Sequence, residues 1–180
     1  MYRNLLVASL LLLCAALLVA CSDPARIARR ECDRLTRMTQ ATEVNVKRET
    51  RAVMLQVAQE EGKRRGEELK KAGCLSTMAT QPSTALEDPC KGIVAASEQR
   101  YEKRQGEVER AAKKADAAIY AVYPAIAVVL DLIETIQAGA KASGWQAKLT
   151  AVVAKAAQAY ADCVAAYVAF KKVITGGGGN

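Results

Sequence analysis

The four prolines of this 180-residue chain stand at Pro24, Pro82, Pro89 and Pro124. Proline lacks a backbone N–H and disfavours the interior of a helix, so these positions indicate where helices begin, bend or break. No segment shows the strict alternation of apolar and polar residues that is typical of a half-buried strand. We therefore predict an all-α fold.

Local signals mark where the helices begin and end. Asp23 can cap the free N–H groups of a helix that starts at Pro24, and Gly73 suits a left-handed C-terminal cap. Between Gly73 and the next periodic stretch, two prolines and several Ser and Thr residues favour a loop. The predicted elements are helices at about 24–72, 93–138 and 145–174, with a loop over 74–92.

These elements predict an elongated antiparallel bundle, or a long helical hairpin followed by a C-terminal helix. Pro124 lies inside the second helix and is expected to break it, since a proline there removes one hydrogen bond of the helix. Residues 21–175 are of a length that fits a single domain. The glycines at the C-terminus predict a flexible tail over 176–180.

The last helix has the clearest periodicity in the chain. Two rows of residues each recur every seven positions, offset by three or four, which is the pattern of a seam that packs against other helices. A core position and a contact with a partner look the same in such a pattern, so both remain open. One row is Leu149, Ala156, Cys163 and Phe170, and the candidate binding seam comprises Val153, Tyr160, Tyr167, Phe170 and Ile174.

The N-terminus indicates export. Leu5 to Ala20 are 16 residues without a charge, about 24 Å as a helix, which is short for a bilayer span. A basic start, a short apolar core and small residues before a cut are typical of a signal peptide, here residues 1–20.

The end of that segment, Leu18-Val19-Ala20-Cys21, resembles the lipobox of bacterial lipoproteins. The resemblance implies that Cys21 receives a diacylglyceryl group, becomes the new N-terminus and is acylated, commonly with palmitate. By the same resemblance, Ser22 after the anchor favours the outer membrane and a periplasm-facing domain. Asp23 leaves the inner membrane open. Three acyl chains suffice for durable anchoring.

Four further cysteines remain in the exported chain, and an even number in an oxidising compartment predicts two disulfides. Cys74 and Cys90 flank the predicted loop and are expected to pair. That pairing leaves Cys32 with Cys163. Counting the rise of straight helices places these two about 18 Å apart in height, so their bridge requires a helix shortened by a bend, for example at Pro124.

The composition of the chain argues against catalysis and metal binding. The chain has no histidine, so the usual general base and commonest metal ligand are missing. No phosphate-binding glycine loop and no Cys-x-x-Cys pair occurs. We therefore expect no enzyme, no catalytic residues, no metal, no cofactor and no small-molecule substrate. Without residues 1–20 the net charge is about +6, which favours anionic partners. The predicted export from the cytoplasm argues against nucleic acid as that partner.

Two functions follow from these features. The first is a membrane-anchored, periplasm-facing lipoprotein that acts as a structural or binding module, with an envelope protein or a second copy as its partner. The alternative is a lysis or exclusion factor of phage or plasmid type. It would act on the membrane through the uncharged segment 117–130, which is too short to span a bilayer.

Overall fold

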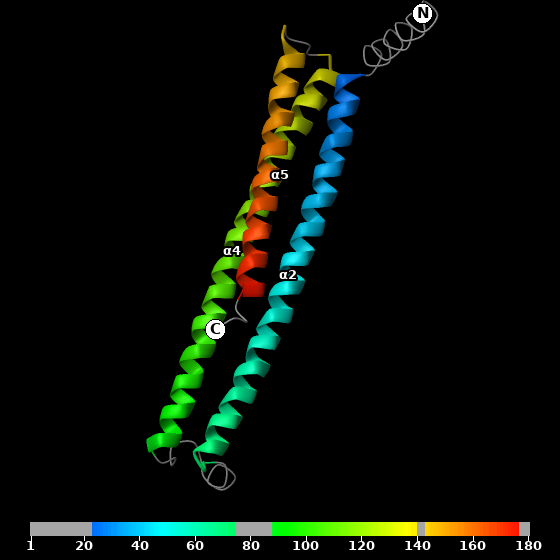
Figure 1. Ribbon diagram of the computed structural model, residues 1–180. Coiled ribbons are helices and arrows are strands. Elements are labelled where there is room, and N and C mark those ends of the chain that lie inside the picture. Colours follow the sequence, from blue (N-terminus) through cyan, green and yellow to red (C-terminus); the bar gives the residue numbers. More distant parts are fainter. Residues whose placement is uncertain (1–22, 75–87, 140–142, 177–180) are drawn as a thin grey trace, which may run out of the picture. The chain divides into compact units, whose positions relative to one another are not determined.

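The computed structural model describes residues 23–74, 88–139 and 143–176. These residues form three helices and no strand: α2 (Pro24–Lys71), α4 (Asp88–Gln137) and α5 (Trp145–Thr175) (Figure 1). The predicted all-α helical bundle is confirmed. The predicted tail, beyond Gly176, and the loop residues 75–87 lie outside the described residues.

The ends of α2 follow the predicted signals. The backbone N–H of Ala25 donates to Asp23 Oδ1 at 3.0 Å, which caps the first turn. At the other end Gly73 has a φ of 75°, and the N–H of Cys74 donates to the Leu69 carbonyl at 2.9 Å. A glycine is needed here because a side chain would strain this left-handed backbone.

The second helix differs from its prediction in two ways. It begins at Asp88 and not near residue 93, because Pro89 falls in the first turn, where a missing N–H costs no hydrogen bond. It also continues through Pro124, so the predicted break is wrong. Val122 and Ile126, on either side, are 0% and 4% exposed. Their burial holds both flanks in the helix despite the lost hydrogen bond.

The chain divides into two compact units. Unit 1 comprises residues 1–40 and 120–162, and unit 2 comprises residues 41–119 and 163–180. In Figure 1 the described part of unit 1 is the blue start of α2, the end of α4 and the orange start of α5. Unit 2 holds the remaining segment of each helix. The single domain over 21–175 stays a prediction.

Seven-residue repeats build the core. From Ala25 to Val46 on α2 and from Val108 to Ile136 on α4 the buried side chains are separated by three and four residues, and on α5 by seven, as in coiled coils. Such spacing keeps one face of a helix toward its neighbours over many turns. The buried rows are Ala25, Ala28, Cys32, Leu35, Thr39, Thr42 and Val46 on α2; Val108, Ala112, Ala115, Ile119, Val122, Ile126, Val129, Ile133 and Ile136 on α4; and Leu149, Ala156, Cys163 and Phe170 on α5.

Candidate functional site

The C-terminal part of α5 is fixed in unit 2 by polar contacts to both other helices. Glu49 Oε1 on α2 accepts hydrogen bonds from Tyr167 Oη and Lys171 Nζ, each at 3.0 Å. On α4, Arg104 donates to the Val173 carbonyl at 2.8 Å. That carbonyl belongs to the last turn of α5, where backbone acceptors lack partners within the helix. Arg104 therefore caps α5 from a neighbouring helix.

The predicted seam divides into two rows by burial. Phe170, in the first row, is 1% exposed and stacks on Tyr167 with ring centroids 6.3 Å apart. The members of the other row, Val153, Tyr160, Tyr167 and Ile174, are half-buried. Burial and the hydrogen bond to Glu49 together raise the pKa of Tyr167. The Phe170 row is thus core within one chain, and the other row borders it.

Beside the end of α5, a groove of about 610 Å³ runs between α4 and α5. Its walls carry Arg104, Arg110 and Lys114 from α4 and Lys172 from α5. Its single acidic residue, Glu107, accepts a hydrogen bond from Arg104 at 3.1 Å. The apolar residues that line it are Ala111, Ala166, Ala169, Val173 and the 1% exposed Phe170. We call this the cationic groove.

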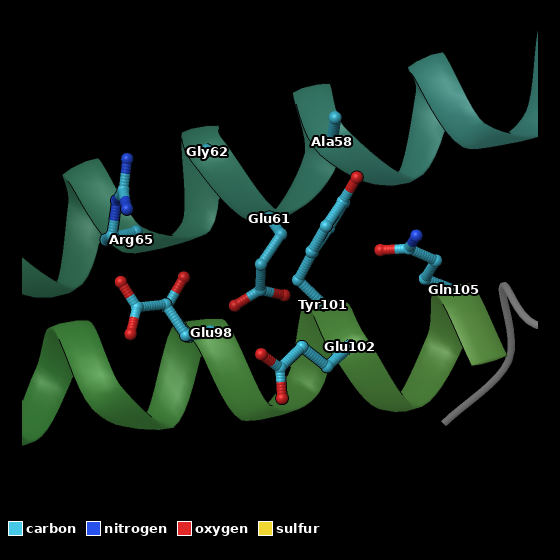
Figure 2. A pocket seen from close by; sticks show the side chains of 9 residues that line it. Ala58, Glu61, Gly62, Arg65, Glu98, Tyr101, Glu102 and Gln105 are labelled. Carbon is cyan, nitrogen blue, oxygen red and sulfur yellow. The ribbon is translucent and has the colours of Figure 1, made fainter.

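A second cavity, of about 330 Å³, lies between α2 and α4 (Figure 2). It has the opposite charge, since Glu61, Glu98 and Glu102 line it and Arg65 is its one basic residue. In Figure 2 the Tyr101 side chain rises from α4 toward α2 beside Glu61.

Arg100 links the two helices next to this cavity. It donates to Glu61 at 2.7 Å and to Glu68 at 2.9 Å. The hydrogen bonds from Arg100 and Arg64 lower the pKa of Glu68. This network crosslinks α2 and α4 within unit 2.

Cys74 and Cys90 form a disulfide bridge, as predicted, with Cα atoms 6.0 Å apart. Both cysteines are buried in a small cluster with Leu69, against which Ile93 and Val94 pack. The disulfide therefore joins the end of α2 to the first turn of α4.

The predicted bridge between Cys32 and Cys163 is absent, because both thiols are free. That pairing required a helix shortened by a bend, and neither α2 nor α4 is interrupted. Each thiol occupies a core position instead, at 2% and 0% exposure. Burial raises the pKa of Cys32 and of Cys163 above the ordinary value of 9.0.

These two thiols should therefore resist alkylation in the folded chain. At neutral pH iodoacetamide should modify them far more slowly in buffer than in denaturant, because a buried, protonated thiol is a poor nucleophile. The raised pKa also favours unfolding as the pH rises above about 9, where the unfolded thiols ionise first. Peptide mass spectrometry reads each site separately. Equal rates with and without denaturant at either site would show that this thiol is not buried.

The remaining predicted site residue, Cys21, lies outside the described residues. Comparison of the chain with protein-family models, curated proteins and solved structures finds no match.

The cationic groove and the cap by Arg104 were not foreseen from the sequence. Arg110 and Lys114 are four residues apart and so share a face of α4. That spacing was the one available signal, and it is also common on solvated helices. Which residues of α5 lie opposite them depends on the register of α4 and α5, which the sequence does not specify.

Proposed function

We propose that this chain is a bacterial lipoprotein, anchored in the outer membrane at Cys21, whose helices act by contact with an envelope partner. The observation that carries the proposal is the lipobox at residues 18–21, followed after two residues by a capped helix. An anchor so close to α2 leaves almost no linker.

Because of this short spacing, the first turns of α2 would lie next to the membrane surface. Arg26, Arg29 and Arg30 are exposed there. With acyl chains attached at Cys21, these guanidinium groups would lie within reach of lipid phosphates, and each such contact contributes about 1 kcal/mol. Anchor and arginines would then hold the bundle against the membrane.

Action by contact is supported by how the polar groups are used. The chain has no histidine, and no group of three or more metal-ligating side chains occurs among the residues described. Arg104, Arg100, Glu49 and Tyr167 all serve to join helices. The features left for a partner are surfaces: grooves and half-buried seam residues.

Replacing Cys21 by Ser should abolish lipidation, because only a thiol forms the thioether. The Cys21→Ser chain should accumulate as a precursor that still carries residues 1–20. Metabolic labelling with a palmitate analogue and mass spectrometry of the N-terminal peptide measure both effects. Cys14→Ser is the matched control and should be labelled and cleaved like the wild type. A wild-type chain without a diacylglyceryl group at Cys21 would refute the anchor.

One observation favours the alternative, a factor that acts on the membrane itself. Within the part of the chain that the structure describes, α4 has the length and apolar character needed to cross a bilayer, although the core helix of a soluble protein shares them. Tyr120 and Val128 on this helix are 55% and 52% exposed. Release of a trapped dye from phospholipid vesicles by the purified chain would distinguish this function from binding.

A further inference from the structure

The cationic groove carries more positive charge than its own residues neutralise. Glu107 pairs with Arg104, which also holds the Val173 carbonyl. None of the described carboxylates forms an ion pair with Arg110, Lys114 or Lys172. Three unpaired cations from two helices therefore line one groove.

The mutual repulsion of these cations is unfavourable. Arg110 and Lys114 are one turn apart on α4, and like charges at that spacing repel each other. Lys172 adds a third positive charge from α5. A bound anion would relieve this repulsion, and phosphate is an anion that Arg and Lys both bind well.

The apolar lining of the groove specifies the rest of the ligand. The accessible part of this lining comes from Val173 and three alanines, Ala111, Ala166 and Ala169. The volume of about 610 Å³ falls within the range of small-molecule sites. A free phosphate would leave this apolar surface uncovered. The fitting ligand is an amphiphile with an anionic head and an apolar chain.

We propose that the cationic groove binds one molecule of an anionic phospholipid. Its phosphate lies among Arg110, Lys114 and Lys172, and the upper part of an acyl chain lies against Ala166, Ala169 and Val173. The choice of phospholipid over other anionic amphiphiles rests on the proposed location in the envelope. The cavity of Figure 2 is lined by three glutamates and repels such a head group.

The test is native mass spectrometry of the full-length chain in a non-ionic detergent, titrated with phosphatidylglycerol. Phosphatidylcholine with the same acyl chains is the zwitterionic comparison. We expect a one-to-one phosphatidylglycerol complex, with at least tenfold lower affinity for phosphatidylcholine. The double variant Arg110→Gln, Lys114→Gln should lose roughly tenfold or more in affinity for phosphatidylglycerol. Lys113→Gln, a neighbouring exposed lysine outside the groove, should bind like the wild type.

Three results would overturn the proposal. Equal affinity for the two lipids, or unchanged binding by the double variant, would show that the cations do not select the ligand. Displacement of the lipid by an equal concentration of glycerol phosphate would show a site for free phosphate. The exposed positions of Arg110 and Lys114 allow the double variant to fold, which its helical melting curve verifies. Cys21 is unaltered in these variants, so failure here leaves the anchor untouched, and an unlipidated Cys21 leaves this binding measurement valid.

Discussion

Replacing Phe170 by Asp should lower the melting temperature of the chain by roughly 10 °C or more. Phe170 heads the fully buried side chains by volume, with 1% exposure. The change removes its apolar contacts and places a carboxylate at a position that is 1% exposed. Removing a carboxylate from water costs several kcal/mol, on top of about 3–5 kcal/mol for the lost ring.

Val168→Asp is the matched control for this measurement. Val168 lies two residues away on the same helix and is 47% exposed, so its replacement should shift the melting temperature by only a few degrees. Circular dichroism at the helical band follows both variants. If the Phe170→Asp and Val168→Asp variants both melt near the wild-type temperature, the Phe170 row is not core and this packing of α5 is wrong.

The sequence predicted α5 well because its apolar residues are sparse enough to reveal their spacing. Leu149, Cys163 and Phe170 recur every seven residues, and the repeat identified this row, although core and partner contact both remained open for it. In α4 the segment 117–130 is uncharged throughout, so no single face can be selected from it. Its buried row, from Val108 to Ile136, became apparent only from packing.

In α2 the first two turns bury small side chains and expose a large one. Ile27 is 53% exposed. The buried positions there are Ala25, Ala28 and Cys32. Small side chains allow helices to approach closely, so burial at this end follows the register of the bundle and not the size of the side chain.

The polar contacts at the end of α5 could not be predicted for a related reason. Glu49 and Tyr167 are 118 positions apart in the chain, and Arg104 and Val173 are 69 apart. Each pair comes into contact because the positions at which the three helices begin and end set how far each helix is shifted along its neighbours. Sequence periodicity specifies the face of a helix but not its height against a neighbour, and the absent Cys32–Cys163 bridge illustrates the same limit.

The bridge between Cys74 and Cys90 should contribute about 3 kcal/mol to stability. It joins residues 16 apart, and closing a loop of about 15 residues lowers the entropy of the unfolded chain by that amount at 25 °C. The double variant Cys74→Ser, Cys90→Ser should therefore unfold at a lower urea concentration than the wild type. The loss should be largest near the bridge, where Leu69, Ile93 and Val94 depend on the two joined ends for their packing.

Reduction supplies the matched control for this variant. A reducing agent should shift the urea midpoint of the wild type to that of the double variant and leave the variant unchanged, because Cys32 and Cys163 are free already. Amide hydrogen exchange near Leu69 and Ile93 should rise in parallel. A wild-type midpoint that stays constant after complete reduction would contradict the prediction. It would mean that the Arg100 network, bonded to Glu61 and Glu68, holds this end of α2 and α4 without the covalent link.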